Sequence, residues 1–241
     1  MHFRLKKIGI FLFSVAILPV YAGDMGPIAY SKGNGFYLVG LATYNSLDFN
    51  RAETASFFSP DAIDAPAASI GNKWGYSLGL GYRFNPVFRT DFRFQEISDI
   101  PFSVTDDGNE TAHGHIDTYT YMLNGYLSYP LPMNERIEPY LSGGLGAAHN
   151  TTNTIFWPLA VQHEFGSTTT QFAWQVGAGG LFRMTKHLDI DINYSFLNIG
   201  RTTNSGQYDT IASNGTPANG APTRFSRVYS NQLSFGLNYR V

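Results

Sequence analysis

Residues 75–84 place a large apolar side chain at every second position, and this period constrains the fold more than any other feature. Tyr76, Leu78, Leu80, Tyr82 and Phe84 alternate with Gly75, Ser77, Gly79, Gly81 and Arg83. After Asn85-Pro86 the alternation resumes, with Phe88, Thr90, Phe92 and Phe94 against Arg89, Asp91, Arg93 and Gln95. Because a period of two sends successive side chains to opposite faces of a sheet, both segments are predicted to be β-strands.

The same period predicts further strands at residues 35–45, 118–129, 138–148, 171–183, 188–196 and 232–241. The first of these is ambiguous, because both of its faces are apolar. Short connections (residues 85–86, 130–136 and 184–187) alternate strictly with long ones (residues 46–73, 98–116, 149–169 and 198–227). Short periplasmic turns and long extracellular loops are typical of transmembrane barrels. The sequence therefore predicts an all-β fold: an eight-stranded antiparallel up-and-down transmembrane β-barrel with four long extracellular loops.

The composition suits strands in lipid better than helices in lipid or a soluble domain. Charged residues make up 14% of the chain, against roughly 25% in an ordinary soluble domain. After residue 22 no apolar run is long enough for a transmembrane helix. A soluble barrel of the lipocalin type would turn its apolar faces inward. Glycines on the polar face, such as Gly79, Gly144 and Gly177, favour the membrane form, since small residues make room inside a narrow barrel.

The N-terminus has the features of a signal peptide. Arg4, Lys6 and Lys7 precede an uncharged run, and Val20-Tyr21-Ala22 forms a small-x-Ala cleavage pattern. We expect residues 1–22 to be removed and residues 23–241 to form the barrel, rather than a retained N-terminal anchor. Removing residues 1–22 takes three of the 16 cations and none of the 18 anions, which leaves a net charge of −5. That balance argues against a nucleic-acid partner, and the absence of Cys excludes disulfides and a lipid-modified cysteine.

The last predicted strand carries a candidate assembly signal. Its apolar face consists of Leu233, Phe235, Leu237, Tyr239 and Val241. This pattern resembles the C-terminal signal of outer-membrane barrels, so it implies the barrel assembly machinery and outer-membrane lipid as partners. That signal usually ends in Phe, and Val241 departs from it.

Three segments carry a wider resemblance. They are Gly35-Phe36-Tyr37, residues 79–84 (GLGYRF) and residues 172–179 (FAWQVGAG). They resemble the outer-membrane β-barrel family of opacity proteins and related surface antigens over most of the mature chain. The resemblance implies a bacterial outer-membrane location and a role in surface exposure, adhesion or small pores.

Charged residues on the inward face are expected to lie near the periplasmic turns. They are Arg83, Arg89, Asp91, Arg93, Arg183, Asp189, Asp191 and Arg240. Arg183, Asp189 and Arg240 fall on neighbouring strands and are predicted to form a row of alternating charge. Because side chains can fill an eight-stranded barrel, we expect an ionic network that plugs the lumen, with a narrow charge-lined passage as the alternative. Asp189→Ala is then expected to destabilise the barrel by roughly 3–5 kcal/mol.

The predicted loops hold the remaining candidates. Ile155, Phe156, Trp157, Leu159 and Val161 form an apolar run in the third loop. It is either a contact patch for a host or neighbouring surface, or a strand extension above the membrane or packing against the barrel mouth. His113 and His115 in the second loop are too few for a metal site. His149 and His163 in the third loop are the only support for a lipid-modifying enzyme. We expect no cofactor and no catalytic residues.

The sequence therefore favours a small surface-exposed outer-membrane protein whose loops carry a structural, adhesion or antigenic role. A narrow porin-like channel is the second hypothesis, and a lipid-modifying enzyme is the third.

Overall fold

The structure is a computed structural model that describes residues 34–56, 59–106, 108–129, 131, 136–158, 162–210 and 217–241. The expected signal peptide lies outside the described residues. Within those residues there is no helix long and apolar enough to cross a membrane.

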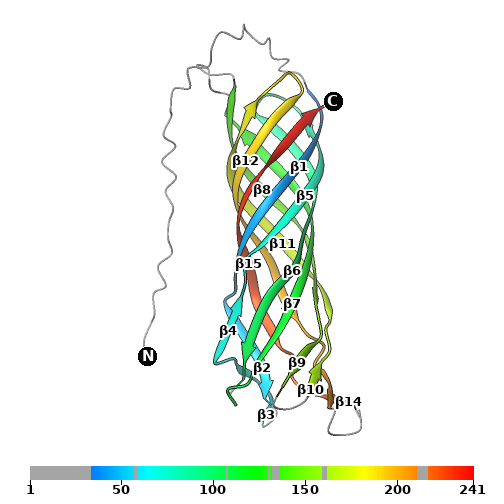
Figure 1. Ribbon diagram of the computed structural model, residues 1–241. Coiled ribbons are helices and arrows are strands. Elements are labelled where there is room, and N and C mark those ends of the chain that lie inside the picture. The colour runs from blue at the N-terminus through cyan, green and yellow to red at the C-terminus, as the bar shows by residue number, and fades with distance from the viewer. Residues whose placement is uncertain are drawn as a thin grey trace.

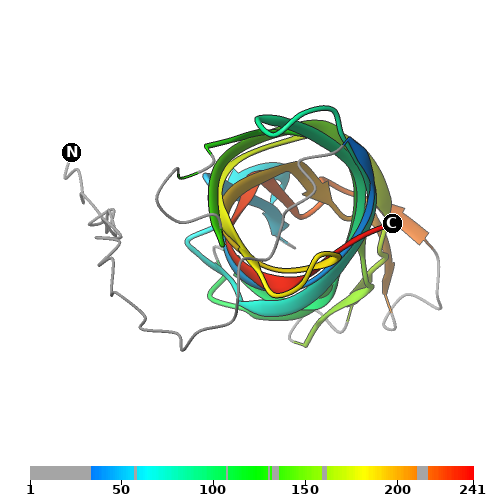
Figure 2. The same ribbon diagram turned by 90° about the horizontal axis from the view of Figure 1, so that it is seen from above.

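Eight long strands form a closed antiparallel barrel, as the sequence predicts (Figure 1). They are β1 (Gly35–Asp48), β5 (Lys73–Arg83), β6 (Phe88–Thr105), β7 (Thr111–Ser128), β8 (Ile137–Thr152), β11 (Thr168–Arg183), β12 (Leu188–Thr203) and β15 (Arg224–Arg240). Each strand pairs with the next along the chain, and β1 closes the ring against β15 with Leu41 opposite Gly236. Seen from above, the strands form a complete ring (Figure 2). Closure leaves the membrane-spanning part without a sheet edge, which lipid could not satisfy.

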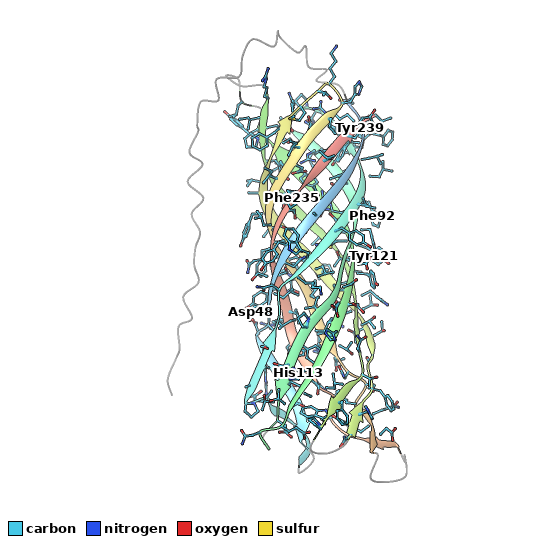
Figure 3. All side chains as sticks on the ribbon, in the orientation of Figure 1. Asp48, Phe92, His113, Tyr121, Phe235 and Tyr239 are labelled. Atoms are coloured by element: carbon cyan, nitrogen blue, oxygen red, sulfur yellow. The ribbon has the colours of Figure 1, made fainter. Side chains whose placement is uncertain are left out.

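The outer face carries a belt of exposed apolar side chains. Leu80, Leu123, Leu141 and Leu237 are all at least half exposed. Figure 3 shows Phe92, Tyr121, Phe235 and Tyr239 along the half of the barrel that carries this belt. The belt is bordered by aromatic clusters, such as Tyr82 with Phe84 near the periplasmic turns. Trp174 packs on Phe196 at the other border. Aromatic girdles of this kind mark the two interfaces of a membrane.

Beyond the second girdle the barrel continues, and the predicted long loops are wrong in this respect. β6 runs on to Thr105 and β7 starts at Thr111, so most of residues 98–116 are strand. The period of two persists there, but its polarity is inverted: Phe102, Val104 and Ile116 point inward, whereas His113 and His115 are exposed. Water surrounds this part, so its apolar side chains turn inward. We call the described residues within 47–73, 97–116, 148–170 and 197–228 the extracellular extension.

Seven short strands complete the extension at the lower end of Figure 1. They are β2 (Arg51–Ser56), β3 (Ser59–Asp64), β4 (Ala67–Ile70), β9 (Ile155–Trp157), β10 (Gln162–Glu164), β13 (Gln207–Thr210) and β14 (Pro217–Asn219). β4 pairs with β6, β2 pairs with β15 and β9 pairs with β7, so three of them join the barrel wall directly.

Two register shifts mark the change of polarity between the belt and the extension. The β6–β7 ladder shifts between Ile97 and Ile100, where Asp99 has a φ of 59°. The β12–β15 ladder shifts around Gly200, which has a φ of 78°. A bulge adds a residue and re-aims the side chains that follow it. In β6 this lets Ile100 point inward three positions after Ile97, which is also inward.

Candidate functional site

The barrel interior is divided into three layers along its axis. A charged layer lies near the periplasmic turns, a neutral polar layer lies at mid-height, and an apolar layer fills the extracellular extension. Most inward side chains of all three layers are buried. Glycines admit the large ones: a Cβ on Gly179 would lie 2.6 Å from the Tyr140 hydroxyl, so only glycine fits beside that ring.

The charged layer holds the eight predicted residues, joined by Glu138 and by three inward tyrosines, Tyr37, Tyr126 and Tyr140. Arg240 binds Asp189 through two nitrogens, with distances of 2.8 and 3.2 Å between Arg240 Nη2 or Nε and Asp189 Oδ2. Arg183 lies opposite Asp189 in the ladder, and its guanidinium donates a hydrogen bond to Glu138. The three residues of the predicted row therefore lie side by side, and Arg183 has in addition a contact with Glu138.

Glu138 is the residue that the sequence prediction missed. It is 1% exposed and receives hydrogen bonds from both Arg83 (2.7 Å) and Arg183 (2.5 Å). The signal was available in the predicted strand 138–148, because Glu138 shares its parity with Gly144, a glycine of the polar face. A carboxylate between two guanidiniums offsets much of the cost of burying three charges.

Asp91 and Arg93 form a second ionic cluster one step deeper. Arg93 Nη2 lies 2.9 Å from Asp91 Oδ2 and 2.7 Å from the Tyr126 hydroxyl. Asn124 donates to the other Asp91 oxygen at 2.8 Å. Asp191, opposite them, accepts a hydrogen bond from the Tyr140 hydroxyl at 2.5 Å.

Arg89 is held in a different way, inside a cage of tyrosine rings. Its guanidinium carbon lies 4.0 Å from the centroid of Tyr126, 4.6 Å from that of Tyr140 and 5.6 Å from that of Tyr37. These contacts are cation–π interactions. Arg89 is 1% exposed, and none of its guanidinium nitrogens makes a hydrogen bond with the residues that the structure describes.

The neutral layer closes the middle of the lumen. Thr43 and Ser234 share a hydrogen bond of 2.9 Å, and Gln232 donates to Asn45 at 2.8 Å. Between this layer and Arg93 lies a cavity of about 10 Å³. A volume of about 10–15 Å³ is needed for a single water molecule. The interior at this height is therefore filled by side chains.

The apolar layer includes part of the predicted contact patch. Ile155 and Trp157 are buried at 0% and 4% exposure in a core with Ile97, Ile100, Phe102 and Phe225. They are not accessible to a partner, so the alternative reading, packing inside the barrel mouth, is correct for these two. Phe156 points outward and is 43% exposed, while Leu159 and Val161 lie outside the described residues.

The four histidines considered in the sequence analysis all lie on strands rather than in loops. His113 and His115 are both outward on β7, and His115 lies 3.5 Å from Asp99. Among the described residues no group of three potential metal ligands comes together. His149 is on β8 and shares a hydrogen bond with Thr170, whereas His163 of β10 packs against the ring of Phe156. Neither contact brings an acid or a serine to the imidazole.

Glu164 is a buried carboxylate on β10, in the part of the extracellular extension that lies farthest from the membrane belt. It is 0% exposed and accepts hydrogen bonds from the Thr223 amide (2.7 Å) and the Thr223 hydroxyl (2.6 Å). Burial raises the pKa of Glu164 to about 7, because the two hydrogen bonds only partly offset the loss of hydration. This contact fastens β10 to the segment before β15.

Comparison with known proteins agrees with this architecture. The family model described as outer membrane protein beta-barrel domain matches residues 10–240. The outer membrane protein PagN of Salmonella typhimurium is 26% identical over 250 residues, covering 94% of this chain and 98% of that protein. An uncharacterized protein of Brucella abortus is 27% identical over 216 residues, covering 77% of this chain and 75% of that protein.

Solved structures of low identity share the fold. The outer membrane protein OprG from Pseudomonas aeruginosa has a TM-score of 0.61 at 13% identity, covering 89% of this chain and 99% of that one. Neisserial surface protein A has a TM-score of 0.50 at 16% identity, covering 87% of this chain and 99% of that one. At these identities the likeness supports the architecture alone.

Proposed function

Since the chain belongs to the outer membrane protein beta-barrel domain family, we propose that it is a closed surface scaffold. It lies in the bacterial outer membrane and holds a rigid extracellular platform for adhesion to a host or neighbouring surface. The observation that carries this proposal is the apolar layer above the membrane belt.

A packed core outside the membrane favours a presenting role. Short turns are enough to connect neighbouring barrel strands, as the periplasmic end shows. The extracellular extension is therefore larger than strand connection alone requires. Here Ile100, Phe102 and Phe225 are each 3% exposed or less, and burying a side chain of this size contributes about 1.5–3 kcal/mol. That stabilisation fixes the extension in one shape, and a preorganised surface loses less entropy when it binds a partner.

Two closures in series argue against a conducting role. The charged layer and its tyrosine rings fill the periplasmic half, and the apolar layer fills the extracellular half. The cavity that lies between them, below the neutral layer, has room for about one water molecule. An ion would have to cross both layers, and the apolar one offers it no polar ligand.

The contact surface is proposed to include the exposed aromatic side chains of the platform. Phe156 is 43% exposed and Phe165 is 38% exposed. Both lie in the segment that forms β9, β10 and their flanks, at the end farthest from the membrane belt (Figure 1). Exposed aromatic residues at the centre of a contact often dominate its binding energy.

Adherence of bacteria that display the protein tests this proposal. Cells of a non-adherent strain carrying the wild type should bind a host-cell monolayer, and the double variant Phe156→Ser/Phe165→Ser should bind less at equal surface amounts. The matched control is Phe92→Tyr, which lies in the lipid belt. Equal, background-level adherence of wild type and vector alone would contradict the adhesive role.

The partners of the barrel itself are proposed from the outer face. On β15, Leu233, Phe235, Leu237 and Tyr239 are at least half exposed, as is Val241 directly after it. These side chains are available to lipid and to the assembly machinery. If the terminal side chain is read during insertion, Val241→Phe should raise the fraction of folded protein in the membrane, measured by heat-modifiable gel mobility. An unchanged fraction would count against that recognition.

A further inference from the structure

The periplasmic mouth of the barrel contains a pocket that the closed-scaffold proposal does not use. Its volume is about 100 Å³, and its lining includes Arg83, Arg89, Lys186, Arg240 and the C-terminal Val241. It lies at the end where the C-terminus is marked in Figure 1, opposite the platform. Four cationic side chains therefore converge on one small space.

Two of these cations already have carboxylate partners. Arg83 binds Glu138 and Arg240 binds Asp189, both at distances below 3 Å. The remaining two differ: Lys186 is exposed and, within the described part of the chain, makes no ion pair. Arg89 is buried with all three guanidinium nitrogens lacking hydrogen bonds to described residues. The Val241 carboxylate lines the pocket but pairs with none of the described cations.

The contacts that hold Arg89 are made to ring centroids rather than to hydrogen-bond acceptors, so its donors remain available. Tyr126 and Tyr140 lie over the guanidinium, with ring centroids 4.0 and 4.6 Å from its central carbon. A cation–π contact uses the ring face rather than a lone pair, so it leaves the guanidinium N–H groups able to donate to another ligand. A buried, unsatisfied donor costs about 1–3 kcal/mol, more when charged, and commonly indicates a bound water or ion.

From this geometry we propose that the periplasmic mouth binds a single phosphate group, with Arg89 at the floor of the pocket and Lys186 at its rim. A guanidinium presents N–H donors in a fork that matches a tetrahedral oxyanion, and an ammonium adds a second charge. The pocket is large enough for one such group and too small for a polymer. The phosphate comes either from free inorganic phosphate or from a lipid headgroup of the inner leaflet, and the chemistry of recognition is the same.

Titration of the detergent-solubilised protein, purified from the membrane, tests this site. The probes are inorganic phosphate and a short-chain phosphatidylglycerol, followed by ³¹P NMR at constant ionic strength. Lys186→Gln should weaken binding of the effective probe by about tenfold, the effect of losing roughly 1.4 kcal/mol. Arg89→Met, which keeps length and apolar contact with the rings, should abolish it. Arg201→Gln, an exposed arginine at the far end of β12, is the matched control and should bind like the wild type.

The outcomes distinguish a site for free phosphate, a site for a lipid headgroup, and the absence of a phosphate site. Binding of inorganic phosphate supports a free-ion site, and binding of the lipid alone supports a headgroup site. Lack of binding of both probes at millimolar concentration overturns the proposal. So does binding that Lys186→Gln leaves unchanged, and this exposed-site variant remains informative if Arg89→Met does not fold. None of these results depends on adhesion.

Discussion

At the scale of single residues, the interior charges are arranged so that almost every one meets an opposite charge, a hydroxyl or a ring. Parity along a strand predicts which charged residues point inward, and all eight predicted ones do so. Parity does not predict the partner, because the choice depends on side-chain reach across the lumen. Arg183 lies opposite Asp189 and also donates to Glu138 on β8, a partner that parity does not predict. The cage around Arg89 also needed the three tyrosines, which the sequence shows only as inward aromatic positions.

Glu138→Ala is expected to be among the most destabilising single changes in the charged layer. It leaves Arg83 and Arg183 without their shared carboxylate, and removing one partner from a buried ion pair costs about 3–5 kcal/mol. Urea unfolding in lipid vesicles measures the loss. Asp64→Asn, which breaks an exposed pair with Arg51, is the control and should cost less than about 1 kcal/mol. Equal effects of the two variants would contradict the role of Glu138.

Glu164 makes the attachment of β10 sensitive to pH. Its pKa is about 7 in the fold, raised by burial from an ordinary value of 4.5. A raised pKa means that the stabilisation is complete below pH 4.5 and is lost as the pH rises through 7. Opening of this segment, followed by hydrogen exchange corrected for its intrinsic pH dependence, should become easier between pH 5 and 8. Glu164→Gln should remove that dependence, since an amide can accept from the Thr223 amide and donate to its hydroxyl. If Glu164→Gln keeps the wild-type pH dependence of hydrogen exchange, a group other than Glu164 is responsible for it.

At the scale of the strands, the sequence predicts where the barrel crosses the membrane better than where its strands end. The alternation over residues 75–84 and 88–95 has its apolar face outward, and the structure follows it. From Ile97 onward the apolar face changes sides through a bulge, so a search for lipid-facing alternation stops there. If the apolar side chains are expected to point inward, as in a water-soluble barrel, the same alternation predicts that β6 continues to Thr105. The missing information is the height of the membrane surface, which the sequence marks only by aromatic residues.

The extracellular extension is expected to behave as a stably folded continuation of the barrel rather than as loops. Ile116→Ala removes an inward side chain that is 1% exposed, and truncating a buried Ile costs about 2–5 kcal/mol. His113→Ala, three positions earlier on the outer face of the same strand, should change stability by less than about 0.5 kcal/mol. Proteolysis of intact cells by an added protease measures both, since a loosened extension exposes new cleavage sites. Equal resistance of both variants would indicate that residues 98–116 are loop-like after all.

At the scale of the whole molecule, the two closures act in series, and a series arrangement has a testable consequence. Opening the charged layer with Arg89→Ala/Tyr126→Ala leaves the apolar layer intact, whereas Phe102→Ala/Trp157→Ala opens the apolar layer and leaves the charged one. Current through two barriers in series is limited by the one that remains closed. Each double variant should therefore be as silent in a planar bilayer as the wild type, and only the quadruple variant should conduct. Steady steps from either double variant, in protein that retains heat-modifiable mobility, would show that one layer alone seals the lumen. Steady current steps from the wild-type protein would contradict the closed-scaffold proposal. The protein would then be a channel whose narrowest point is the region around Arg93.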